Sequence, residues 1–251
     1  MTTLTALVLL LFALMVLIGG KTGFNSFLSV MVNGILLVLV ALLISWGINI
    51  LVLTLIFIPL KLAAIIFLGT HDMIVAKNSF YAAILVATAT ILIIICLQYF
   101  AQAAGFGDEA GEELVGLSPY PGLSYPEIAI TVAIFSTLGA ISEASVAMSS
   151  GILELKKHNP EITRIQLEKS GANIGKDVLG TSVNTILFGL FGSFLPLFIW
   201  YMRLNYPLGK ILNDKLFVNE VLIMVYSIIG VALTIPLTSY LLAKKVSKEK
   251  A

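Results

Sequence analysis

Two ionisable residues lie inside long apolar stretches of this sequence and are its first candidates for chemistry. Lys61 and Glu143 each lie some 8–12 Å inside the nearer end of their stretch, at about 1.5 Å of helical rise per residue. A charge at membrane depth costs about 2.5–3.5 kcal/mol on insertion scales, so such a group usually faces a partner, a cavity or a pathway. Because the two residues share a depth, we predict that they pair.

A third apolar stretch begins at its internal end with Lys176 and Asp177. Further along it, Thr181 and Asn184 reach a depth comparable to that of Lys61 and Glu143. Thr181 and Asn184 are three residues apart, so they share one face of a helix. We therefore predict that Lys61, Glu143 and Asn184 form one polar cluster inside the bundle.

Small residues accompany this cluster on two of the stretches. They are Gly139, Ser142, Ser145 and Gly180. Small side chains let helix backbones approach closely within a membrane. We predict that the helices over 125–148 and 178–202 pack together through them.

Two interpretations of the cluster remain open. In the first, Glu143 exchanges a proton or a cation while the bundle alternates between states, because burial disfavours its charged form and Lys61 favours it. In the second, Lys61 extends towards the inner headgroups and Glu143 only fixes helix packing. We favour the first.

Other kinds of chemistry lack the residues that they need. The sequence has no glycine-rich phosphate loop, no nucleophile elbow and a single cysteine, Cys96. His71 and His158 are far apart, so we expect no metal site and no cofactor. Ser149 and Ser150 have no histidine at membrane depth to activate them, and we expect no enzymatic activity.

The composition indicates what must position these residues. Of 251 residues, 59% are hydrophobic and 12% are charged, against about a quarter charged in soluble domains. The apolar residues form blocks near the length of about twenty residues that a spanning helix needs, without the alternation of a barrel strand. We predict an all-α integral membrane bundle of seven spans, over residues 3–18, 27–45, 48–68, 79–100, 125–148, 178–202 and 217–243. A net charge of +1 gives no reason to expect nucleic acid as a partner.

Basic residues set the expected orientation. Most Lys and Arg residues fall on the side that holds 149–177 and the carboxyl terminus, whereas the other side has only Arg203, Lys210 and Lys215. By the positive-inside rule, the amino terminus lies outside and the carboxyl terminus in the cytoplasm. The second and third spans are separated only by residues 45–49, which we interpret as a tight helical hairpin.

Two hydrophilic segments complete the chain. Residues 149–177 are expected to carry a short amphipathic helix at the inner surface, begun by Asn159 and Pro160 and ended by Gly171. Residues 101–124 form the predicted external loop, with acidic residues Asp108, Glu109, Glu112 and Glu113.

Several segments resemble the YibE/F-like family of bacterial multispanning membrane proteins. The segments lie around Glu143 (139–150), around Lys176 (167–177), over 178–185 and over 61–70. The family usually has aspartate where this chain has Glu143, and often Arg at Lys176, so charge is kept while side-chain length differs. The resemblance implies a homologous membrane subunit or a homo-oligomer as partner, and names no substrate.

We therefore expect a multi-pass protein of the bacterial plasma membrane that acts as a permease or permease subunit. Its solute or ion is unknown, and Glu143 is the expected coupling residue. The alternative is a non-transporting scaffold or regulatory subunit of a membrane complex, in which the polar cluster only specifies assembly.

Overall fold

The computed structural model describes residues 2–105 and 124–248, and within them the chain forms helices and no strands. The helices are α1 (Thr3–Ser45), α2 (Ile50–Gly69), α3 (Met73–Ala101), α5 (Tyr125–His158), α6 (Arg164–Arg203), α7 (Leu208–Leu212) and α8 (Lys215–Lys248). Six of these described helices are long and apolar enough to cross a membrane. The predicted all-α integral membrane class is confirmed.

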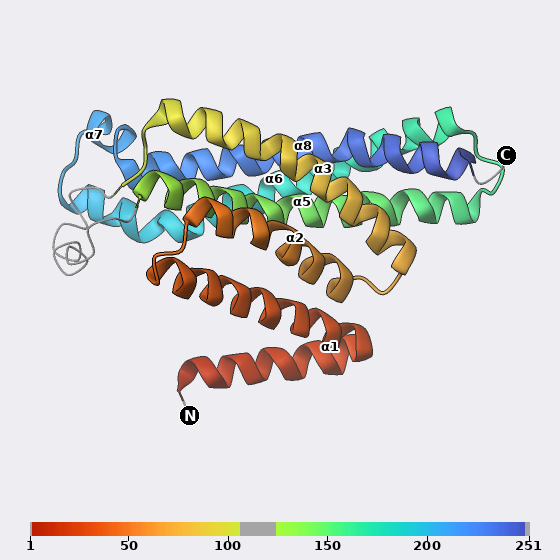
Figure 1. Ribbon diagram of the computed structural model, residues 1–251, viewed down its shortest axis with the longest axis horizontal. Coiled ribbons are helices and arrows are strands. Elements are labelled where there is room, and N and C mark those ends of the chain that lie inside the picture. Colours follow the sequence, from red (N-terminus) through yellow and green to blue (C-terminus); the bar gives the residue numbers. More distant parts are fainter. Residues whose placement is uncertain (1, 106–123, 249–251) are drawn as a thin grey trace.

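Helix α1 consists of two antiparallel arms. Gly20 interrupts the helix with φ +55° and ψ −130°, and Figure 1 shows the chain reversing direction within α1. Gly23 then lies against the backbone carbonyl of Met15, where any Cβ atom would overlap it. The predicted spans 3–18 and 27–45 lie on these two arms.

The predicted hairpin over residues 45–49 is confirmed. Helix α1 ends at Ser45, and Gly47 has φ +83°, a left-handed conformation that glycine adopts without strain. The side chain of Asn49 accepts a hydrogen bond of 3.0 Å from the N–H of Val52 and so caps α2. Capping and the glycine turn together permit two spans to follow each other directly.

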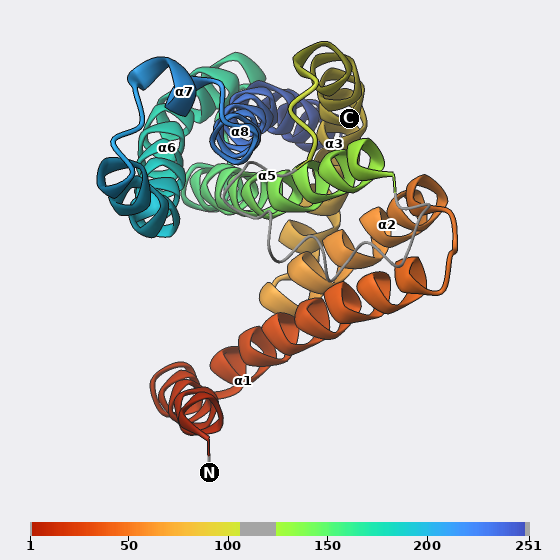
Figure 2. The ribbon, with the colours of Figure 1, turned by 90° about the vertical axis from the view of Figure 1, so that its left-hand side faces the viewer.

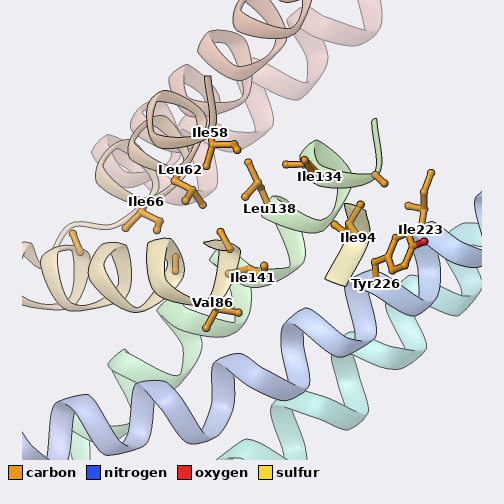
Figure 3. Packing of buried hydrophobic residues seen from close by; sticks show 14 residues of the cluster. Ile58, Leu62, Ile66, Val86, Ile94, Ile134, Leu138, Ile141, Ile223 and Tyr226 are labelled. Carbon is orange, nitrogen blue, oxygen red and sulfur yellow. The ribbon is translucent and has the colours of Figure 1, made fainter. Parts of the chain in front are cut away.

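Helices α3, α5 and α8 meet in the central core, with α2 on one side of α5 and α6 on the other (Figure 2). Leu62 of α2, Val86 of α3, Ile141 of α5 and Tyr226 of α8 all belong to this core, and Figure 3 shows Val86 beside Ile141. All four are almost fully buried. Many large apolar side chains outside the core are exposed, as a bundle surrounded by lipid tails requires.

Successive long segments run in alternating directions along the bundle (Figure 1). The amino terminus lies at one end, and the carboxyl terminus lies at the other. The connections at 46–49 and 204–214 lie at the amino-terminal end, and those at 70–72 and 159–163 at the carboxyl-terminal end. This arrangement matches an odd number of crossings, and the assignment of the carboxyl-terminal end to the cytoplasm stays a prediction from the basic residues.

The prediction of a separate amphipathic helix within 149–177 is wrong. Helix α5 continues to His158, with Asn159 as its C-cap. Helix α6 begins at Arg164 after a capping box between Thr163 and Gln166, and it runs through Gly171 without a break. The hydrophilic sequence marks two spanning helices that extend past the apolar layer, because polar residues on helix ends meet water there.

The predicted external loop over 101–124 lies largely outside the described residues. Its four acidic residues, at 108, 109, 112 and 113, are among those that the structure does not describe.

Candidate functional site

Lys61 lies inside the protein, as the sequence predicted. It is 7% exposed, and its Nζ atom lies 5.1 Å from the ring centroid of Phe135 on α5. A cation over an aromatic ring is stabilised by about 0.5–2 kcal/mol. The partner of Lys61 across the α2–α5 contact is therefore this ring, with no ion pair among the described residues.

Glu143 does not lie inside the protein. Its side chain is exposed on α5, and it forms no hydrogen bond or ion pair with the described residues. The predicted pairing with Lys61 is wrong. Lys61 lies beside Phe135, eight residues before Glu143 on α5 and thus about 12 Å from it along the helix. The two residues therefore differ both in level and in the direction in which their side chains point.

The polar residues of α6 are exposed as well. Asp177, Thr181 and Asn184 face outwards, and the hydroxyl of Thr181 donates to the carbonyl of Asp177, 3.0 Å away on its own helix. The predicted interior cluster of Lys61, Glu143 and Asn184 is therefore not formed within this chain.

Of the four small residues predicted to pack α5 against α6, two are buried and two have open space beside them. Ser142 and Ser145 are fully buried, and the hydroxyl of Ser79 on α3 donates to the carbonyl of Ser145 at 3.2 Å. Gly139 and Gly180 have open space beside them, so their predicted role in packing α5 against α6 is wrong.

Other glycines make the close contacts of these helices. A Cβ atom at Gly151 of α5 would lie 3.2 Å from Ile174 of α6, which confirms that α5 and α6 pack together. Gly175 of α6 lies directly against Ile235 of α8. Gly171 and Gly175 let α6 approach α8. The sequence analysis took Gly171 for a helix end and did not predict a packing role for either glycine.

Glu143 and the polar residues of α6 nevertheless share an outward face. At about 100° per residue, Glu143 lies about 80° from Gly151, on the side of α5 turned away from α8. Asn184 lies about 80° from Ile174, also on the side turned away from α8. The contact between Gly151 and Ile174 fixes the register, so Glu143 lies at the level of residue 182. We call Gly139, Glu143, Asp177, Thr181 and Asn184 the Glu143 face.

Two cavities lie between α6 and α8, at opposite ends of the helix pair. One has about 360 Å³ and is lined by Glu168, Lys176, Pro236, Ser239 and Tyr240 among others. We call it the Lys176 cavity. The other, the Glu220 cavity, has about 600 Å³ and is lined by Ser193, Phe194, Pro196, Trp200, Asn219 and Glu220 among others.

The charged groups at the Lys176 cavity are mostly basic. Glu168 is paired with Arg164 at 2.8 Å. Arg164 and Lys244 both lie over the ring of Tyr240, at 5.3 and 5.9 Å from its centroid. Arg164, Lys176 and Lys244 outnumber Glu168, so this end of the helix pair carries a net positive charge.

A polar network that the sequence analysis missed lies beside the Glu220 cavity. The Nε2 atom of Gln98 on α3 donates to Oδ1 of Asn219 at 3.0 Å, and Tyr226 donates to Oε1 of Gln98 at 3.1 Å. Asn219 and Glu220 fall inside the predicted span 217–243. Polar groups within apolar stretches were the available signal, and it applied to these residues as much as to Glu143.

The fold and the placement of its polar residues define a multi-pass helical membrane protein. The profile of the YibE/F-like protein family matches residues 7–248, and the chain belongs to this family. No curated protein and no solved structure matches the chain.

Proposed function

We propose that this protein is a permease, or a permease subunit, of the bacterial plasma membrane, and that its solute passes along the contact between α6 and α8. The observation that carries this proposal is the pair of cavities at opposite ends of one helix pair. A protein that alternates access needs a mouth at each side of the membrane and a closed segment between them.

Each cavity is lined by a proline within a spanning helix. Pro196 of α6 lines the Glu220 cavity, and Pro236 of α8 lines the Lys176 cavity. Proline has no N–H for the carbonyl four residues earlier, so a helix bends most readily there. The two mouths therefore have separate bending points on different helices, as opening them in turn requires.

Buried serines lie between the two mouths. Ser182 of α6 is 6% exposed and Ser227 of α8 is 5% exposed. Ser182 is seven residues after Gly175, so it shares the face of α6 that packs on α8. The hydroxyl of Ser182 therefore offers a hydrogen bond to a solute that crosses this contact, and Ser227 lies at about the same level on α8.

Thiol accessibility tests the pathway without a known solute. In a Cys96→Ser background, Ser182→Cys and Ser227→Cys are treated with a charged, membrane-impermeant thiol reagent, in intact cells and in inverted vesicles. Leu92→Cys is the control, because Leu92 is 66% exposed on α3 and faces lipid. We expect at least one of the thiols at positions 182 and 227 to react about tenfold faster than the control, since thiolate formation requires water. If both thiols match the control from both sides, the pathway is excluded.

The Glu143 face supports a second candidate function, a subunit that assembles a membrane complex. A carboxylate towards lipid is costly, and Glu143 and Asp177 have no counter-ion on this face. Its amide and hydroxyl groups both donate and accept hydrogen bonds, so the face is complementary to itself. A second copy of this chain fits this face. Its packing there removes Glu143 from lipid and supplies hydrogen bonds to the carboxylate. This second function also accommodates the first, as two subunits of one permease.

A further inference from the structure

The Glu220 cavity contains an acidic group without a counter-ion. Glu220 is half-buried and forms no hydrogen bond or ion pair with the described residues. Lys215, five residues earlier on α8, extends towards Gly105. A half-buried carboxylate is costly without a cation, and the described residues supply no cation to Glu220.

The walls of the cavity select among cations. Phe194 is 7% exposed and Trp200 is 53% exposed, and both line the cavity with Glu220. Aromatic faces attract cations, and tryptophan does so most strongly. A carboxylate beside aromatic rings is the arrangement by which proteins recognise organic ammonium groups.

A bare metal ion fits these walls less well. Calcium and magnesium take six or more oxygen ligands, whereas the described residues contain no group of three or more His, Cys, Asp or Glu that could hold a metal. At about 600 Å³ the cavity is also of the size that holds small organic molecules.

We propose that the Glu220 cavity binds an organic ammonium group, with Glu220 as its counter-ion and Trp200 as its aromatic wall. The inference rests on the proposed function, because this cavity is one mouth of the proposed pathway. A soluble amine and the ammonium headgroup of a phospholipid share this chemistry. Both sources remain open, since Trp200 lies three residues from the end of its spanning helix, where headgroups are found.

The fluorescence of Trp200 tests the proposal directly. The chain has two tryptophans, and Trp46→Phe leaves Trp200 as the only one. The full-length variant is purified in a detergent without ammonium groups and titrated with tetramethylammonium chloride, with sodium chloride at equal ionic strength as reference. We expect a saturable change in Trp200 emission with tetramethylammonium and none with sodium.

Three variants assign the response to residues. Glu220→Gln is expected to weaken tetramethylammonium binding about tenfold or more, because it removes the charge that pairs with the ligand. Glu154→Gln removes an exposed acid near the far end of α5, at the opposite end of the bundle from the Glu220 cavity, and is expected to leave the affinity unchanged. Trp200→Leu keeps the carboxylate and removes the ring, and calorimetry should show weaker binding for it too. A Glu220→Gln protein that elutes as a single peak and binds as well as the parent overturns the proposal, as does a response to sodium of equal size.

Lipid nanodiscs distinguish the two sources. If phosphatidylethanolamine discs weaken the response and phosphatidylglycerol discs do not, a headgroup competes for the site. An equal response in both discs assigns the site to a soluble amine. Absence of saturable binding in every environment excludes the ammonium site, and reactive thiols at Ser182→Cys or Ser227→Cys would then still support the pathway.

Discussion

The hydroxyl of Tyr226 donates a hydrogen bond to the Oε1 atom of Gln98, and this bond joins α8 to α3 at the level of the Glu220 cavity. Gln98 also donates to Asn219, so both the Nε2 atom and the Oε1 atom of its amide group form hydrogen bonds. The network fixes Asn219, and with it the start of α8, against α3. The Glu220 cavity thus has one wall fixed by hydrogen bonds, and its other wall, α6, is free of this network.

Removing this network should lower stability in a graded way. Tyr226→Phe loses one hydrogen bond, which within membranes contributes about 0.6 kcal/mol on average. Gln98→Leu should cost more, because it leaves Tyr226 and Asn219 without their partner. Thermal unfolding followed by size-exclusion chromatography measures both. Tyr99→Phe, at a residue that is 75% exposed, is the control and should unfold like the parent; a loss as large as that of Tyr226→Phe would contradict the assignment.

The contact between Gly175 and Ile235 should not tolerate a methyl group. Gly175→Ala places its Cβ atom on the branched side chain of Ile235, and overpacking of this kind costs about 1–3 kcal/mol. Gly180→Ala is the matched control five residues later, with open space around it. It should leave the melting temperature unchanged or raise it, since alanine favours helices by about 1 kcal/mol over glycine. Equal melting temperatures for the two variants would mean that α6 and α8 are not in close contact.

The Glu143 face should contact a second copy in the membrane. Gly139→Cys in a Cys96→Ser background is expected to form a disulfide-linked dimer on oxidation of native membranes. Leu92→Cys, on the exposed surface of α3, should stay monomeric under the same conditions. Crosslinking of both variants would show random collision, and crosslinking of neither would remove the second copy as occupant of this face.

The orientation of the bundle can be measured with the same reagents. We expect Asn205→Cys to be labelled from outside intact cells and His71→Cys only in inverted vesicles. The connection after α2, which holds His71, and the connection after α6, which holds Asn205, lie at opposite ends of the bundle (Figure 1). The basic residues favour a cytoplasmic location for the end that holds the first of these connections. The reverse pattern would invert the topology while leaving the fold unchanged.

The sequence sufficed for the helical membrane class and for the order of the apolar segments, because helices must be apolar over about twenty residues to cross a bilayer. Six described helices meet this criterion, and two of the seven predicted spans are the two arms of α1. It also sufficed for the turn at Gly47 and the burial of Lys61. It did not place Glu143 correctly, because an exposed position on a membrane helix is as apolar in its surroundings as a buried one. Hydrophobic periodicity therefore carries little information about which side of α5 faces inwards.

The same limit explains the missed cavities. Pro196 and Pro236 were visible in the sequence as possible bends, but only the packing of α6 on α8 shows that both bends border one contact. Gly175 was equally visible, and its role depends on Ile235, sixty residues later in the chain. Contacts between distant segments decide such roles, and a single sequence does not contain them.

Helix α6 is longer than a membrane requires. Its 40 residues span about 60 Å at 1.5 Å per residue, against about 30 Å of hydrocarbon. Pro196 lies near one end and Arg164 at the other, about 48 Å away. A small change in the bend at Pro196 therefore produces a large displacement at the opposite end of the helix, near Arg164. A label at that end would report on the state of the Glu220 cavity from the opposite side of the membrane.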